Sequence, residues 1–164
     1  MPLGEQPRRL SHVESTRVFA LLTTHMGTNP DDGQDVESGH VRLLDDQTFE
    51  RCDSYSLQPQ ETALSILTLA FDGEGADATF VAVGTAFARP DEPEPTSGRL
   101  LIFSVTERTL ELKHELSTAG AVYSLEAFNG KLLAARPDPN PDPNPNPNPT
   151  LTPTLTLTLT LTLP

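Results

Sequence analysis

Residues 79–87, TFVAVGTAF, and residues 99–105, RLLIFSV, decide the fold of this chain. Both segments are short, apolar and contain β-branched side chains, which favours β-strands. The segment between them, residues 89–98 (RPDEPEPTSG), contains three prolines and three acidic side chains. A connection of this composition must project into solvent, so we expect two neighbouring strands joined by an exposed loop.

The same pattern continues outward from this pair in both directions. Further apolar bursts of strand length are residues 18–22, 41–44, 49–57, 63–71, 110–116, 121–128 and 131–135. Turn-forming residues separate them at 45–48 (DDQT), 72–75 (DGEG), 97–98 (SG) and 129–130 (NG). Asn129-Gly130 is the strongest of these signals, because both residue types tolerate the positive φ of a type I′ hairpin turn.

These segments predict an all-β fold, an antiparallel meander of about eight or nine strands. The spacing suits a sandwich, a barrel or a propeller. A helix over residues 63–71 (ALSILTLAF) is an alternative, because Ala and Leu are good helix formers. Residues 27–39 (GTNPDDGQDVESG) are polar and rich in turn formers, so we expect a loop there.

Length, charge and cysteine content limit the classes of function. The 164 residues leave room for one ordinary domain, and the net charge of −12 argues against a direct grip on nucleic-acid phosphates. Cys52 is the single cysteine, which excludes a disulfide framework and indicates a reducing compartment. There is no apolar run of membrane-spanning length and no secretory signal, so we expect a nuclear or cytoplasmic protein.

Catalytic and ligand-binding patterns are not found, so we expect no enzyme, no cofactor site and no metal site, and the sequence identifies no binding residues. Four histidines lack metal-ligand spacing: His12, His25, His40 and His114. Two carboxylate pairs lie in expected turns: Asp31-Asp32 and Asp45-Asp46. Two glycines lack the helix and lysine of a phosphate loop: Gly73 and Gly75. Three serines lack a nucleophile-elbow context: Ser65, Ser104 and Ser124.

The C-terminal part of the chain differs in composition. Nine of the 16 prolines lie between Pro137 and Pro164, first as Pro-Asn and Pro-Asp repeats and then before a Thr-Leu repeat. We expect a disordered, low-complexity tail that makes few contacts with the body. A tandem DNA hexamer CCCTAA reads as Pro-Asn in one frame and Leu-Thr in another, so one frame slip would generate the tail. The codons would then be CCT AAC and ACC CTA with few exceptions; a selected proline-rich ligand would show diverse codons.

Two groups of motifs resemble one known family. The first group is residues 81–86 (VAVGTA), the loop 90–95 (PDEPEP) and residues 98–103 (GRLLIF). The second is residues 120–125 (GAVYSL) and 128–134 (FNGKLLA). Both are similar to the family that unites the large subunit of the UV-damaged-DNA-binding complex with the A subunit of the cleavage and polyadenylation specificity factor and a splicing-factor subunit. The second group resembles the damaged-DNA-binding branch more narrowly.

The resemblance implies a partial β-propeller of about two blades, part of a third propeller, over residues 8–136. Residues 1–7 are then a disordered N-terminus and residues 137–164 the repeat tail. It also implies a scaffold with protein partners, the substrate receptors that it links to a cullin–RING ubiquitin ligase in DNA repair, with nucleic acid at the level of the whole complex. The alternatives are an RNA-processing subunit of the same family, which would bind nucleic acid, and a non-functional truncated gene product. The family would continue with another strand after Ala134, where the repeat tail begins here.

Two blades do not close a propeller, so we expect the isolated chain to fold poorly. At least one sheet face would have no cover, and residues 63–71, 79–87 and 99–105 are the apolar strands at risk. Several large side chains left in water, at about 1.5–3 kcal/mol each, would offset the roughly 5–15 kcal/mol that stabilises a small domain. We expect insolubility, self-association or a broad non-cooperative melt.

Overall fold

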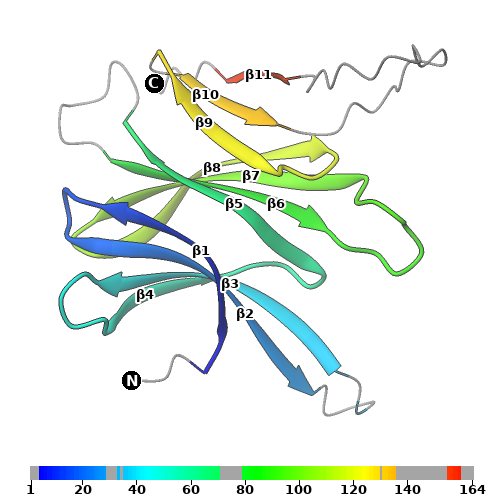
Figure 1. Cartoon of the computed structure of the whole chain (residues 1–164), viewed down its shortest axis with the longest axis horizontal. Coiled ribbons are helices and arrows are strands. Elements are labelled where there is room, and N and C mark those ends of the chain that lie inside the picture. Colours follow the sequence, from blue (N-terminus) through cyan, green and yellow to red (C-terminus); the bar gives the residue numbers. More distant parts are fainter. Residues whose placement is uncertain are drawn as a thin grey trace, which may run out of the picture.

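In the computed structural model, the described residues are 4–28, 33, 35–70, 79–129, 131–135 and, as backbone only, 155–159. They form three antiparallel sheets that follow one another along the chain (Figure 1). The first sheet contains β1 (Gln6–Val13), β2 (Val18–Thr28), β3 (Asp35–Asp45) and β4 (Arg51–Ser56). The second contains β5 (Glu61–Leu69), β6 (Phe80–Phe87), β7 (Ser97–Thr106) and β8 (Thr109–Ala119). The third contains β9 (Ser124–Phe128), β10 (Lys131–Ala135) and β11 (Leu155–Leu159). Within the described residues there is no helix, and so none long and apolar enough to cross a membrane.

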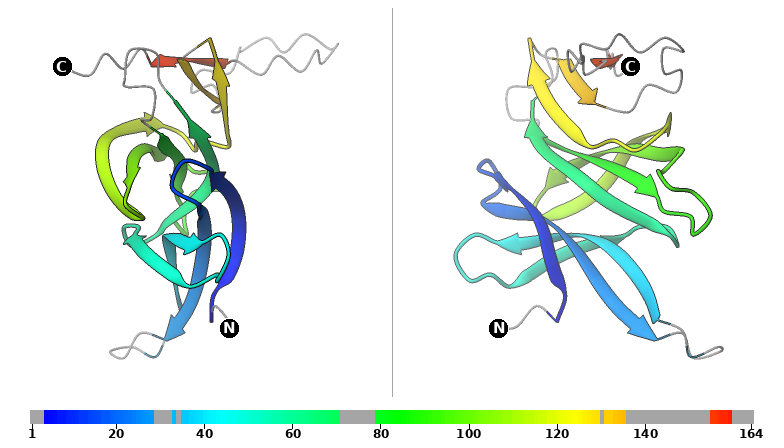
Figure 2. Two further views of the ribbon diagram at one scale, coloured as in Figure 1. Left: turned by 90° about the vertical axis from the view of Figure 1, so that its left-hand side faces the viewer. Right: turned by 45° about the vertical axis from the view of Figure 1, so that its right-hand side comes forward.

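The two main sheets are four-stranded meanders, each with its strands paired in chain order. The first strand of each sheet lies against the first strand of the next, β1 against β5 and β5 against β9. Figure 2 shows the second sheet between the other two. Four-stranded meanders stacked through their faces, with their first strands adjacent, are the blades of a β-propeller. The all-β prediction and the partial propeller are confirmed.

Two hydrophobic cores lie on opposite faces of the second sheet. In β6, Val81 and Val83 face the first sheet, whereas Phe80 and Ala82 face the third. Strand β7 divides its LLIF run in the same way, with Leu101 and Phe103 on one side and Leu100 and Ile102 on the other. Because strand side chains alternate between the two faces, a strand covered on both reads as a continuous apolar run.

The strands that we expected to be at risk of exposure are therefore covered on both faces. Residues 63–69, 80–87 and 99–105 lie in the second sheet, between the two cores. The count of about two blades missed that Val122, Leu125 and Leu132 begin a third sheet, which covers the second. Among the described residues, the faces without a second sheet on them are the outer faces of β1–β4 and of β9–β11.

A buried polar network holds β5, β6 and β7 in register. The Arg99 guanidinium forms an ion pair with the Glu61 carboxylate, and Thr85 donates its hydroxyl to Glu61 Oε1 at 2.6 Å. The backbone N–H of Arg99 donates to Thr85 Oγ1 at 3.0 Å. Glu61, Thr85 and Arg99 are each at most 3% exposed. A second carboxylate, Glu115 of β8, accepts from Arg99 Nη1 at 2.8 Å, so the network spans the whole sheet.

The hairpin at Asn129-Gly130 is confirmed by its register. Phe128 pairs with Lys131, which leaves a two-residue loop, and Asn129 has a φ of 48°. Gly130 lies outside the described residues. The helix considered for residues 63–71 is wrong, because β5 occupies Glu61–Leu69.

Two expected breaks between strands are wrong. Thr28 pairs with Asp35 and Gly27 with Val36, so β2 and β3 extend into the predicted loop 27–39 as a two-stranded ribbon. Backbone pairing sustains this ribbon beyond the core, since its apolar side chain Val36 is 47% exposed and not buried in the core. Ser97 and Gly98 are not a turn but the start of β7, where a Cβ on Gly98 would collide with the backbone oxygens of Thr85 and Gly120. That glycine serves close approach, not a turn.

The two ends of the chain also differ from expectation. Gln6 and Pro7 of the predicted disordered N-terminus belong to β1, a polar strand (QPRRLSHV) without the apolar pattern that indicates strands. Residues 155–159 of the predicted disordered tail form β11, which pairs with β10. The remainder of residues 137–164 lies outside the described residues.

A candidate protein-binding rim

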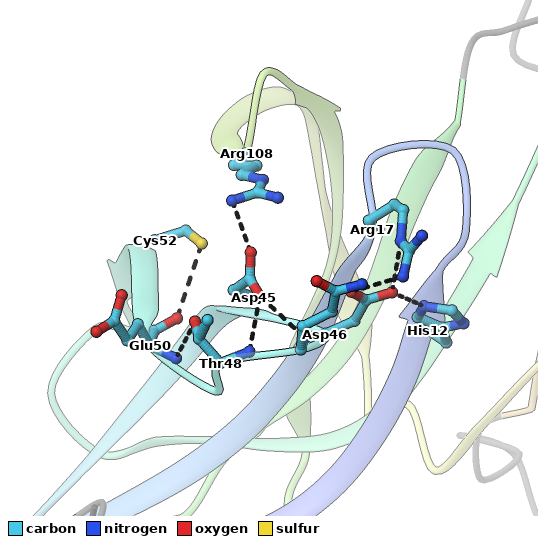
Figure 3. A network of polar contacts seen from close by, with 9 residues as sticks. His12, Arg17, Asp45, Asp46, Thr48, Glu50, Cys52 and Arg108 are labelled. Carbon is cyan, nitrogen blue, oxygen red and sulfur yellow. Dashed lines mark hydrogen bonds and ion pairs between the residues drawn. The ribbon is translucent and has the colours of Figure 1, made fainter.

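Three turns meet at one edge of the first two sheets and form the candidate site. They connect β1 to β2 (residues 14–17), β3 to β4 (residues 46–50) and β7 to β8 (residues 107–108). We call the following side chains the rim cluster: His12, Arg17, Asp45, Asp46, Phe49 and Arg108. Figure 3 shows the polar members of this cluster reaching toward one another from the three turns.

Asp45 organises the β3–β4 turn. Its Oδ1 accepts the backbone N–H groups of Gln47 at 2.9 Å and Thr48 at 2.8 Å, and its backbone oxygen accepts from Phe49 N at 3.0 Å. The N–H groups of Thr48 and Gln47 hold the pKa of the Asp45 carboxyl below its usual value. The turn predicted at residues 45–48 is thus present, and the Asp45 side chain serves backbone geometry.

Arg108 joins the second sheet to this turn. Thr106 pairs with Thr109, so Glu107 and Arg108 form a two-residue hairpin loop with φ values of 50° and 67°. Two non-glycine residues with positive φ are unfavourable, because a Cβ crowds the backbone in that region. The loop directs Arg108 Nη1 to Asp45 Oδ2 at 2.6 Å. The strained turn therefore places a charged contact across the seam between the two sheets.

Asp46 links the first two turns of the same sheet. Its Oδ2 accepts from Arg17 Nε at 3.1 Å and lies 3.3 Å from His12 Nε2. The hydrogen bond from the Arg17 side chain is the main cause that lowers the pKa of the Asp46 carboxyl. Arg17 itself has a φ of 57°, and its backbone oxygen accepts from Asp46 N at 3.1 Å. The two turns are therefore fixed to each other through backbone and side chain together.

An aromatic strip runs beside these charges. The His12 and Phe19 rings have centroids 4.9 Å apart, and Phe19 stacks on Phe49 at 6.0 Å with an interplanar angle of 13°. Phe49 is 63% exposed and has a φ of 57°, so the turn holds a phenylalanine outward. An exposed, positioned aromatic ring in a cluster that also contains Arg17 and Arg108 has the composition of a protein-binding hot spot.

The structure disperses the other singled-out residues. His25 lies in β2, His40 in β3 and His114 in β8, apart from His12 in the rim cluster. Among the described residues, no three His, Cys, Asp or Glu side chains gather as a metal-binding group. Asp31-Asp32, Gly73 and Gly75 lie outside the described residues.

The three serines sit on sheet strands. Ser65 is buried and donates its hydroxyl to the backbone oxygen of Val122 at 2.9 Å, which ties the second sheet to the third. Ser104 is half-buried in β7, and Ser124 is exposed at the start of β9. Cys52 is exposed on β4, with its Sγ 3.8 Å from the Glu50 backbone oxygen.

Sequence reasoning missed the rim cluster as a site. It treated Asp45-Asp46 as a turn and found nothing in Glu107-Arg108, which has no glycine or asparagine to signal a hairpin. The one available signal was Phe49, an aromatic residue directly after a polar turn, where burial is not expected.

Known proteins match a large part of this chain. The model of the family described as the CPSF A subunit region matches residues 38–136. The chain belongs to this family. DNA damage-binding protein 1 of Solanum lycopersicum is 49% identical over 136 residues, and DNA damage-binding protein 1a of Arabidopsis thaliana is 47% identical over 135 residues. Each match covers 82% of this chain but only 12% of the length of the relative.

The residues that carry the resemblance to the CPSF A subunit family have physical roles in this fold. A Cβ on Gly84 would collide with Ser65 Oγ and the Val122 side chain, so this glycine lets the second and third sheets approach. Thr85 and Arg99 belong to the buried polar network. Three residues of the second motif group pack in the core between the second and third sheets: Val122, Leu132 and Ala134. The motifs therefore encode packing between blades.

Proposed function

We propose that this chain is part of a protein-interaction scaffold of the damaged-DNA-binding branch, which links substrate receptors to a cullin–RING ubiquitin ligase in DNA repair in the nucleus. The rim cluster binds the protein partner, with Phe49 as its central contact. The chain contributes no catalytic group, and contact with nucleic acid belongs to the whole complex. The identity to relatives named DNA damage-binding protein supports the branch.

The observation that carries the binding role is the exposed Phe49 ring on a turn fixed from both sides. Asp45 anchors the turn through the Gln47 and Thr48 N–H groups, and the Phe19 ring supports the Phe49 ring. A ring held in place before binding loses little conformational freedom when a partner covers it. Hot spots of this kind typically change binding by 2 kcal/mol or more when truncated.

The test measures binding of a purified cullin–RING substrate receptor to the 164-residue chain by biolayer interferometry. We expect saturable binding that weakens by about thirtyfold or more in Phe49→Ala, which corresponds to at least about 2 kcal/mol. Phe128→Ala is the matched control, because Phe128 is 60% exposed on the third sheet and lies outside the rim cluster. Equal effects of the two substitutions, or no saturable binding, would refute the proposal. Tight binding of single-stranded RNA would favour the RNA-processing branch instead.

A further inference from the structure

The third sheet is completed by a strand from far along the chain. Strands β9 and β10 form a hairpin, but β11 follows β10 only after residues 136–154. Within the first two sheets, the longest connection between paired strands is residues 70–79. The edge of β10 that continues the sheet thus accepts a strand that reaches it through a longer connection.

The register of this added strand is not specified by its sequence. Leu132 pairs with Leu159 and Leu133 with Thr158, and the register then shifts before Ala135 pairs with Leu155. Residues 154–163 read TLTLTLTLTL, so a slip of two residues places an identical residue at every position. Alternating strands without distinct side chains are prone to slippage and to exchange between copies.

The acceptor edge, in contrast, is well fixed. Leu132 and Ala134 of β10 are 0% and 1% exposed and pack in the core against the second sheet. Five residue pairs hold β10 to β9, and Tyr123 N donates to the Ala135 backbone oxygen at 3.0 Å. When β11 leaves, this fixed edge has unpaired backbone groups and is a template for another strand.

We propose that the β10 edge is a strand-acceptor site that takes the Thr-Leu segment of a second copy of this chain in exchange for its own. A segment joined by a connection of this length has an effective concentration of order millimolar, so a second copy competes as the protein concentration rises. Reciprocal exchange preserves the β10–β11 pairing in both copies, which is the low-cost route to a swapped dimer.

Disulfide trapping tests this exchange in the full chain, with Cys52→Ser as background. Leu133 and Thr158 are opposite each other in the register, and directly paired strand residues lie within the reach of a disulfide. L133C and T158C are placed on separate copies, mixed at about 0.1 mM, a tenth of the effective concentration above, and oxidised mildly. We expect a linked heterodimer, identified by its cross-linked peptide, and similar yields when T156C or T160C replaces T158C.

Two tail variants serve as the matched pair for this experiment. The double variant Leu157→Pro, Leu161→Pro places a proline in every stretch of the Thr-Leu repeat that is as long as β11. It should reduce the yield of the heterodimer at least fivefold, since proline removes the backbone donor. The double variant Leu157→Val, Leu161→Val preserves strand propensity and should form the heterodimer in the same yield as the parent. The proposal is overturned if L133C/T158C on one chain links only within that chain while the mixture stays unlinked. It is also overturned if the proline variants link as well as the parent.

Discussion

The second sheet buries consecutive residues of β6 and β7, whereas the first sheet buries one face against it and leaves the other without a sheet. In the first sheet, Ala20, Leu22 and Leu43 face the shared core, while Leu10 and Phe49 on the other side are 57% and 63% exposed. Both sheets have the same four-stranded topology. The difference in burial therefore comes from the number of sheets that pack against each one, and not from the strand topology of the blade. A fold built of stacked blades requires this.

The largest expected effect is the difference in stability loss between truncating a buried phenylalanine and truncating one on the open side of the first sheet. Phe103 is fully buried between the first two sheets and meets Tyr55 edge-on at 5.0 Å, so Phe103→Ala should cost about 3–5 kcal/mol. Phe49→Ala on the open side should stay within about 0.5 kcal/mol. Hydrogen exchange of β6 and β7 amides measures both as opening free energies. Equal losses would mean that the open face is covered as well as the core.

The buried ion pair of the second sheet should be the next most sensitive feature. Glu61→Gln leaves the Arg99 guanidinium with only the Glu115 carboxylate in a buried site, at a cost of about 3 kcal/mol. Arg89→Gln is the control, because the Arg89–Glu92 pair is exposed and worth at most about 1 kcal/mol. Hydrogen exchange of the β6 and β7 amides measures the stability loss of both variants. A small effect of Glu61→Gln would show that this network does not hold the sheet.

The close approach of the second and third sheets at Gly84 predicts a smaller loss of stability when this glycine is replaced. Gly84→Ala forces a Cβ against Val122 and Ser65, which should cost about 1–3 kcal/mol. Val122→Ala in the same chain should recover part of this cost by removing the side chain that the methyl meets. Gly27→Ala is the control, since its nearest atom would be 3.7 Å away. If the double variant were no better than Gly84→Ala, the collision would not be the cause.

Acid should act on the first sheet through Glu5. Hydrogen bonding from Arg42 is the main cause that lowers the pKa of Glu5 from 4.5 to about 2. A lowered folded pKa means that this stabilisation is complete above about pH 4.5 and is lost as the pH falls toward 2. We expect β1–β3 amides to lose about 1–3 kcal/mol of protection in this window. Glu5→Gln should remove the contribution of Glu5 and leave that of Asp45 and Asp46, whose pKa values are also lowered; an unchanged profile would contradict the role of Glu5.

The sequence predicted most strands because their apolar residues are buried. It predicted β6 and β7 from apolar runs and the β9–β10 hairpin from Asn129-Gly130. It missed β1, whose side chains are mostly exposed, and the outer part of the β2–β3 ribbon, because backbone pairing alone leaves no hydropathy pattern. The rim cluster could not be predicted, since Arg17, Phe49 and Arg108 are brought together by turns of two different sheets.

The expectation of exposed apolar strands shows the same limit. The number of strands predicts the number of blades, but it does not predict which blade lies between two others. The contacts that cover the second sheet come from Val122 and Leu132, which lie far along the chain. The expectation of poor folding stays a prediction, and the structure moves its origin from the second sheet to the outer faces of the first and third sheets. The first sheet should open before the second.

Hydrogen exchange of the full chain along a urea series tests this order most directly. It is recorded at micromolar concentration, well below the roughly millimolar range in which strand exchange competes. We predict that β1–β4 amides lose protection at lower urea than β6 and β7 amides, in a broad or two-step transition, because local opening follows buried contact. A single cooperative transition of a monomer, with equal protection in all three sheets, would contradict the account.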